Sequence, residues 1–178
     1  AAWCDLRELV PYAFGYMMAA KVGTGIVAEI GSMRITEEID ALEVMGIDSM
    51  TFLCATRLLA AWMVLPFLYI SAVGAGFAAS YLAVVIQIGE VSQGGYSLIF
   101  WQFQNPPDLL FSAMKAMSMA TVIVLVGCYY GYTASGGPVG VGTATAKSMV
   151  LNIVLVHLIG MLGTQLFWGQ NPRAPIGG

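Results

Sequence analysis

Hydrophobic residues are gathered along the chain into four long blocks, and polar residues are gathered into the shorter segments between them. The blocks comprise residues 9–28, 58–89, 109–132 and 148–168. Each block holds at least the roughly 20 residues that a helix needs to cross the hydrocarbon core of a bilayer. Because lipid offers no partner to an unpaired backbone group, spans of this kind are helical. The pattern therefore predicts an all-α integral membrane protein, a polytopic helical bundle with four spans.

Three connections of different character separate these blocks. Residues 32–57 are polar and charged, residues 133–147 are rich in glycine, and residues 90–108 are aromatic with a Pro-Pro break. We expect the glycine-rich connection to be flexible. Tryptophan and tyrosine favour the membrane–water interface, so we expect residues 94–103 to form a short interfacial helix.

Lysine and arginine residues orient the bundle. The charged and glycine-rich connections contain Arg34, Arg57 and Lys147, whereas the aromatic connection and the C-terminal tail contain only Arg173. Cytoplasmic loops carry an excess of these two residue types. We therefore expect residues 32–57 and 133–147 in the cytoplasm, and residues 90–108 and the tail on the outer side.

The composition supports the membrane class and narrows the partners. Hydrophobic residues make up 58% of the chain and charged residues only 10%, against about 25% charged residues in a typical soluble domain. The net charge is −3 and there is no basic tract, which argues against nucleic acid as a partner. The three cysteines, Cys4, Cys54 and Cys128, are widely separated, so they indicate packing residues rather than a disulfide framework or a metal site.

One polar segment, EIGSMRITEEIDALEVMGID at residues 29–48, contains six of the ten acidic residues. Within it, residues 36–46 predict a short helix, with Thr36 as the N-cap and Gly46 just past the C-terminal end. The helix is amphipathic, with one apolar and one acidic face: Ile39, Leu42 and Met45 against Glu37, Asp40 and Glu43. The pattern alone favours a solvated loop helix. The alternative is a docking element for a soluble partner.

The stretch from Gly31 to Asp48 resembles the cytoplasmic coupling-helix region of the MlaE/YrbE permeases. These are the membrane subunits of ABC transporters that move lipids together with MCE-domain proteins. The shared pattern is G-x-M-R-x-T-E-E-I-D-A-L-E-x-M-G-I-D, with L-R-E-L-x-P and A-E-I-G upstream and Arg57, Pro66 and the span carrying Lys115 downstream. The resemblance covers nearly the whole chain. The E-E-I-D-A-L version and the proline-containing tail look more like the actinobacterial YrbE branch.

This resemblance implies one permease domain over residues 1–178, in a family with five membrane helices and an N-terminal amphipathic helix. Since four spans are visible, we expect that amphipathic helix and the first span to be missing from the chain. The resemblance also implies that residues 36–46 are a coupling helix on the cytoplasmic side. Its implied contacts with an ABC ATPase dimer are Arg34, Glu37, Glu38, Asp40, Leu42, Glu43 and Met45.

The resemblance implies further partners and a location. The partners are a second YrbE-type permease subunit, MCE-domain proteins and membrane lipids, and the location is the bacterial inner (plasma) membrane. ATP and Mg would be bound by the partner ATPase. In GPVGVGTATAKS, residues 137–148, Ala146 stands where a phosphate-binding loop needs glycine. We therefore expect a transport subunit that is not itself an enzyme.

Three ionisable residues, Arg7, Glu8 and Lys115, lie in or beside apolar blocks. Such groups are costly when they face lipid, and they usually pair or line a cavity. From the residues alone, a structural salt bridge between spans and a functional cavity are equally good interpretations. The resemblance favours the cavity, because the matching family residues lie around the lipid cavity between two permease subunits. A secondary carrier or channel that uses these charges without an ATPase is the alternative function.

Two more polar side chains lie within the predicted spans. Lys21 is expected to extend to the cytoplasmic interface or to approach Glu29. His157 is the only histidine. Because a single histidine cannot build a metal site, we expect a packed or hydrogen-bonded side chain.

Overall fold

The computed structural model describes residues 2–89 and 91–170, and almost all of these residues are helical. The chain is helical without a break from Ala2 to Ile35. This run consists of α1 (Ala2–Cys4), α2 (Val10–Met18) and α3 (Thr24–Ile35), joined by the π-helical segments η1 (Asp5–Leu9) and η2 (Ala19–Gly23). The later elements are α4 (Glu38–Val44), α5 (Ser49–Tyr81) with its π-helical continuation η3 (Leu82–Ile88), α6 (Gln93–Gln102), α7 (Pro106–Tyr132) and α8 (Gly137–Trp168).

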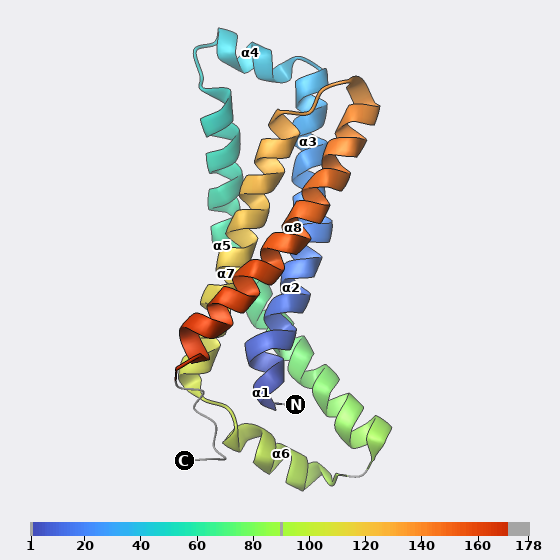
Figure 1. Cartoon of the computed structure of the whole chain (residues 1–178), viewed down its shortest axis with the longest axis vertical. Coiled ribbons are helices and arrows are strands. Elements are labelled where there is room, and N and C mark those ends of the chain that lie inside the picture. Colours follow the sequence, from blue (N-terminus) through green and yellow to red (C-terminus); the bar gives the residue numbers. More distant parts are fainter. Residues whose placement is uncertain (1, 90, 171–178) are drawn as a thin grey trace.

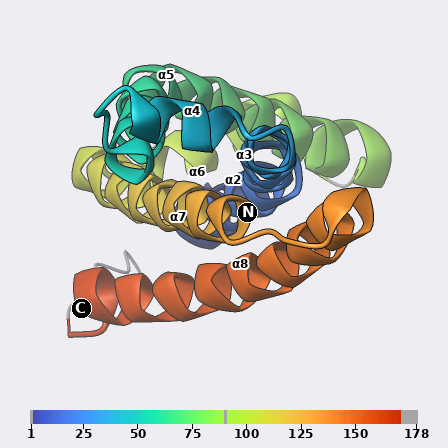
Figure 2. The ribbon, with the colours of Figure 1, turned by 90° about the horizontal axis from the view of Figure 1, so that it is seen from above.

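The long helices form one bundle around α7 (Figures 1 and 2). Helix α7 lies between α5 on one side and α8 on the other, and α2 and α3 also pack against it. Helix α4 lies across one end of the bundle, and α6 crosses the opposite end, near the N-terminus (Figure 1). We refer to these as the α4 end and the α6 end.

Three helices in the described part of the chain are long and apolar enough to cross a membrane: Ser49–Ile88, Pro106–Tyr132 and Gly137–Trp168. They contain three of the four predicted spans. The fourth predicted span, residues 9–28, lies in the helical run from Ala2 to Ile35 and is not among the three, so it stays a prediction.

The outer surface of the bundle is apolar. On α5, Met63 is 74% and Phe67 is 73% exposed, and on α8, Leu166 is 79% exposed. Large exposed apolar surfaces of this kind mark contact with a membrane or a protein partner. The side chains that face outward are therefore suited to contact with lipid or with another protein in the membrane.

The N-terminal ends of α5, α6 and α7 are set by capping side chains and by prolines. Asp48 and Ser92 stand before α5 and α6, and each accepts a hydrogen bond from the backbone N–H three residues further on. Such caps satisfy a donor that the helix leaves unpaired. Helix α7 opens with Pro106 and Pro107, whose missing N–H groups would be unpaired at this position in any case.

Two connections are shorter than the sequence predicts. The prediction of a flexible segment over residues 133–147 is wrong, because α8 already begins at Gly137 and only residues 133–136 form the link. Gly136 has a left-handed φ of 88°, and Pro138 lies in the first turn of the helix, where its fixed φ favours helix formation. These two residues set the start of α8 in spite of the glycines that follow. Similarly, α3 and α5 extend into the polar connection at residues 32–57.

The predicted N-cap of α4 is also wrong. Thr36 instead caps the C-terminal end of α3, where its hydroxyl donates to the carbonyl oxygen of Ser32 at 3.1 Å. The residue before α4 is Glu37, with a left-handed φ of 60°. Threonine hydroxyls can bond backward to their own helix as readily as they cap the next one. The reversal at Glu37 therefore separates α3 from α4.

The end of α4 agrees with its prediction. Gly46 has a left-handed φ of 78°, and its N–H donates to the carbonyl oxygen of Glu43 at 2.9 Å. The N–H of Ile47 donates to the carbonyl oxygen of Leu42 at 3.2 Å. These two bonds form a Schellman motif, which ends a helix at a glycine.

Glycines allow α3 and α7 to approach closely. A Cβ atom on Gly131 would lie 2.8 Å from Cβ of Ile30, and one on Gly127 would lie 3.2 Å from the carbonyl oxygen of Gly23. Small residues at such contacts are what lets membrane helices pack tightly. The close approach brings Ile30 into a buried cluster with residues of α4, α5 and α7.

We predict that Gly131→Ala destabilises the bundle, because the new methyl group would overlap Ile30 and force α3 away from α7. The expected loss is about 1–3 kcal/mol, seen as a lower midpoint of thermal unfolding of the detergent-solubilised protein. Gly142→Ala on α8 is the matched control, since the position that its methyl group would occupy faces open space. Equal midpoints for the two variants would contradict the packing argument.

Candidate functional site

Charged and polar side chains from three helical elements meet inside the α6 end of the bundle. The π-helical segment η1 carries Arg7 and Glu8, and α7 carries Asp108 and Lys115. Helix α8 adds Thr164 and Trp168, which complete the set that we call the polar cluster. The structure thus brings together the three residues that the sequence singled out, and it adds three more.

The first half of the polar cluster is an ion pair between Arg7 and Asp108. The Nε and Nη2 atoms of Arg7 donate to Oδ2 of Asp108 at 2.9 and 2.6 Å. The other carboxylate oxygen, Oδ1, accepts from the indole Nε1 of Trp168 at 2.9 Å. The side chains of Arg7 and Asp108 are only 7% and 2% exposed. Removing one partner of such a buried pair typically costs about 3–5 kcal/mol, so this contact fixes η1 against α7.

Aromatic rings cover the guanidinium group of Arg7. Its Cζ atom lies 4.0 Å from the centre of the Trp3 ring and 5.0 Å from that of Trp168. A cation over an aromatic face is attracted by the negative charge of the ring surface. The two tryptophans therefore replace water around a charge that lies at the end of an apolar bundle.

The second half of the polar cluster surrounds Lys115. Its Nζ atom donates to Oε2 of Glu8 at 2.9 Å, to Oγ1 of Thr164 at 2.7 Å and to the backbone oxygen of Arg7 at 3.1 Å. An ammonium group has three protons to donate, and here all three are used. The hydroxyl of Thr164 also donates to the second carboxylate oxygen of Glu8. Lys115 thus ties η1, α7 and α8 together.

A cavity of about 370 Å³ opens beside the polar cluster. Arg7, Glu8 and Thr164 line it together with Trp3, Cys4, Gln165, Trp168 and Gly169. The Lys115 side chain is fully buried behind this lining, whereas that of Glu8 is 33% exposed. Of the predicted cavity residues, Glu8 is therefore the one best placed to meet a ligand directly.

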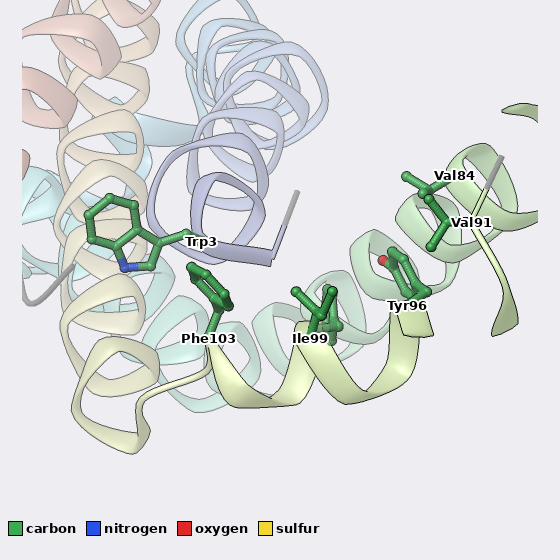
Figure 3. A pocket seen from close by; sticks show the side chains of 7 residues that line it. Trp3, Val84, Val91, Tyr96, Ile99 and Phe103 are labelled. Carbon is green, nitrogen blue, oxygen red and sulfur yellow. The ribbon is translucent and has the colours of Figure 1, made fainter. Parts of the chain in front are cut away.

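A second, aromatic cavity of about 310 Å³ lies on the other side of Trp3. Figure 3 shows Tyr96, Ile99 and Phe103 on one side of α6, with Trp3 close to Phe103 and Val84 across the space. Trp3 lines both cavities. Its indole ring therefore separates a charged space from an apolar one at the α6 end.

The sequence missed three members of the polar cluster. Asp108 falls in the predicted aromatic connection, directly after two prolines, but the prolines begin α7 and Asp108 lies in its first turn. Thr164 and Trp168 lie on α8, four residues apart, and so project from the same face of that helix. An acid at the start of a predicted span, opposite an arginine at the edge of another, is the signal that points to Asp108.

At the α4 end, the predicted coupling residues divide into two groups. One group holds α4 against the bundle: Glu43 accepts from Oγ of Ser49 at 2.8 Å and from the hydroxyl of Tyr132 at 3.0 Å. Arg34 donates to Oδ1 of Asp40 at 2.8 Å. Ile39, fully buried, inserts between α3, α5 and α7. Glu43 and the exposed Arg34–Asp40 pair therefore hold α4 against the bundle at its surface, and Ile39 anchors it from the inside.

The second group faces outward. Met45 is 66% exposed, and Glu37 and Glu38 are also exposed. Leu42 is half-buried, so the predicted apolar face is shared between the bundle and the surface. The sequence missed Val44, which is 89% exposed and adjoins Met45. The result is an apolar tip next to acidic side chains.

Lys21 and His157 have different environments. The ring of His157 is hydrogen-bonded at 2.8 Å on both sides, to the hydroxyl of Tyr16 and to the carbonyl oxygen of Ile153, as the sequence predicts. Lys21 does not pair with Glu29, because the Glu29 carboxylate binds Nη2 of Arg57 at 2.9 Å.

The fold and the site define a multi-pass helical membrane protein with a fully paired ionic cluster inside its bundle. A family model described as Permease MlaE matches residues 1–166, and the chain belongs to that family. The family predicted from the sequence is thereby confirmed.

Named relatives are similar over most of the chain. A probable ABC transporter permease protein of Rickettsia bellii is 34% identical over 162 residues, which cover 91% of this chain and 62% of that protein. The chloroplastic protein TRIGALACTOSYLDIACYLGLYCEROL 1 of Arabidopsis thaliana is 28% identical over 166 residues, 91% of this chain and 46% of that protein. A probable ABC transporter permease protein of Synechocystis is 28% identical, with 85% and 57% covered. The chain thus spans less than two thirds of the length of these curated relatives.

We predict that acid loosens α4. The hydrogen bonds from Ser49 and Tyr132 hold the pKa of Glu43 below its ordinary value of 4.5. Because the folded pKa is the lower one, the stabilisation is present above about pH 4.5 and is lost as the pH falls through the folded pKa. Amide hydrogen exchange of α4, corrected for the intrinsic effect of pH, should rise between about pH 6 and about pH 3.5.

Substitutions at two glutamates test the cause. Glu43→Gln should raise exchange in α4 several-fold already at neutral pH and remove most of the change on acidification. Glu37→Gln is the matched control, because Glu37 is exposed at the start of α4 and should leave the wild-type pH profile intact. The same profile in all three proteins would show that Glu43 does not hold α4.

Proposed function

We propose that this chain is the permease subunit of an ATP-driven lipid transporter of the MCE type. The observation that carries the proposal is its membership in the Permease MlaE family, together with relatives named as ABC transporter permeases. The name of the Arabidopsis relative is that of a diacylglycerol lipid, which supports lipid as the substrate. The subunit itself performs no covalent chemistry.

The lipid cavity of the proposed transporter lies at the α6 end. Arg7 and Glu8 form a polar lining there, with Lys115 bonded to Glu8 behind it, and the aromatic cavity beyond Trp3 offers apolar surface. A lipid needs both kinds of surface, because its headgroup is polar and its chains are apolar. In the assembled transporter, a second YrbE-type permease subunit would enclose the cavity, and MCE-domain proteins on the outer side would exchange lipid with it.

Helix α4 is the proposed coupling helix. A dimer of ABC ATPase subunits, which would bind ATP and Mg, would contact its exposed tip and its acidic side chains. The contacts of Glu43, Asp40 and the buried Ile39 connect α4 to α3, α5 and α7. A displacement of α4 by the ATPase would therefore move the ends of these helices as one body. In this proposal the α4 end lies in the cytoplasm and the α6 end lies on the outer side of the bacterial inner membrane.

The cavity proposal predicts that Lys115→Ala and Glu8→Ala reduce lipid bound to the purified complex and lipid transport in proteoliposomes. We expect a loss of about tenfold, the equivalent of about 1.4 kcal/mol, because each change breaks the contacts that order the polar cluster. Tyr69→Phe is the control, since it removes a buried hydroxyl bonded to Ser112 that does not line the cavity. Unchanged lipid occupancy and transport in both cluster variants would refute the cavity proposal.

The coupling proposal predicts that the ATPase is lost when α4 is altered on its outer side. Glu38→Arg combined with Asp40→Arg, and separately Val44→Asp combined with Met45→Asp, should abolish co-purification of the ATPase. Val139→Asp is the matched control, because Val139 is 78% exposed near the start of α8 without belonging to α4. A stoichiometric complex in both double variants would exclude α4 as the docking element.

Co-purification of the wild-type protein with an ABC ATPase also distinguishes the proposed permease from a secondary carrier or channel. A secondary carrier or channel would use the buried charges without nucleotide hydrolysis. If the wild-type protein co-purifies with no ABC ATPase, the carrier becomes the better account of the polar cluster.

A further inference from the structure

A long apolar groove lies between α2 and the second half of α5, apart from the polar cluster. It encloses about 580 Å³ and is lined mainly by aliphatic and small side chains, among them Leu9, Ala13, Met17, Leu68, Ala72 and Ala75. The small side chains belong mostly to α5, and the space exists because they do not fill the gap to α2. Among the residues that the structure describes, no acidic residue lines the groove.

In the described part of the chain, Lys21 is the one charged residue that lines the groove. Arg7, Lys115, Arg34 and Arg57 each pair with a carboxylate. Within residues 2–89 and 91–170, Lys21 has no such partner, and Glu29, the acid nearest along its own helix, is bound to Arg57. A cation in an apolar span without a protein partner usually faces a cavity or a substrate path.

The position of Lys21 suits a lipid headgroup held below the membrane surface. Lys21 precedes Glu29 by eight residues, or about 12 Å of helix, so it lies within the predicted apolar span 9–28, and its side chain is exposed where the groove opens. From Leu9 to Lys21 the groove extends over about 18 Å, slightly more than the roughly 15 Å depth of one leaflet. An acyl chain can therefore lie along the groove with its headgroup at the Lys21 end.

The polar cluster does not offer the same attraction for a negative charge. Its two cations, Arg7 and Lys115, are already neutralised by Asp108 and Glu8 at 2.6 and 2.9 Å. An anionic headgroup would have to compete with these carboxylates. Lys21 has no competing anion in the described part of the chain, so electrostatic complementarity favours the groove.

We propose that this groove binds an anionic lipid from the surrounding bilayer, with its acyl chain between α2 and α5 and its negatively charged group on Nζ of Lys21. The inference rests on the proposed lipid transport and extends it with a second binding position and a substrate charge. The headgroup is drawn below the interface of its own leaflet, which is the displacement that extraction of a lipid requires.

Photocrosslinking in nanodiscs tests the proposal. The full-length protein in its complex is placed in phosphatidylcholine nanodiscs that contain a trace of lipid with a diazirine in the acyl chain. The headgroup is phosphatidylglycerol in one sample and phosphatidylcholine in the other. We expect the anionic probe to label groove residues such as Met17 and Ala72 about tenfold more strongly, the size of losing or gaining one hydrogen bond to a charged group.

Matched variants identify the cause. Lys21→Gln and Ala75→Phe, which fills the groove, should each lower this labelling about tenfold, and Lys21→Arg should retain it. Lys147→Gln removes an exposed cation elsewhere, and Ala78→Phe enlarges an exposed α5 residue outside the groove. Both controls should label as the wild type does.

Three results would overturn the proposal. Equal labelling by the two probes would show that the headgroup charge is not recognised. Unchanged labelling in Lys21→Gln would show that Lys21 is not the anchor. Absence of labelling in the wild type would mean that another protein segment or a second copy covers the groove. In each case loss of transport in Lys115→Ala would still support the proposed function, so the two ideas fail independently.

Discussion

The bundle depends on one constraint: a lysine ammonium group buried among apolar helices must find an acceptor for each of its protons. Lys115 finds them on Glu8, Thr164 and the backbone of Arg7, and these acceptors come from two other helical elements. Hydrogen bonding therefore directs how η1, α7 and α8 meet at the α6 end, in addition to the less directional apolar packing of residues such as Leu6 and Ala116. The Arg7–Asp108 ion pair is a second contact that fixes η1 against α7.

The opposite end is fixed by a different combination of forces. Ile39 contributes apolar packing, and Glu43 contributes hydrogen bonds to α5 and α7. Toward this end, close glycine contacts also hold α3 to α7. A bundle secured at both ends transmits displacement along its helices more readily than one held only at its centre, since packed interiors deform little. The groove at Lys21 lies between these fixed regions, where the α2–α5 contact is least filled.

The long helices could be predicted from the sequence because apolar length is a strong signal, and Arg7, Glu8 and Lys115 could be grouped because charge in a span is rare. Prediction fails where two local interactions compete. Thr36 bonds backward rather than forward, and the glycines before Lys147 are outweighed by the helix start at Gly136 and Pro138. Asp108 and Thr164 escape prediction because pairing between distant helices is decided by three-dimensional packing. For the same reason, proximity along the helix does not pair Lys21 with Glu29, whose carboxylate binds Arg57 instead.

The full burial of Ile39 has a consequence for protein engineering and for divergence between paralogues. Residues 37–45 carry both the side chains of the proposed ATPase contact and the buried anchor Ile39. A chimera that exchanges only this segment between two permeases would place Ile39 against the α3, α5 and α7 side chains of a different protein, which are not shaped to pack against it. The outer surface of α4 therefore cannot change independently of the residues that pack against Ile39. To move the proposed ATPase contact from one permease to another, the surrounding residues of α3, α5 and α7 would have to be exchanged as well.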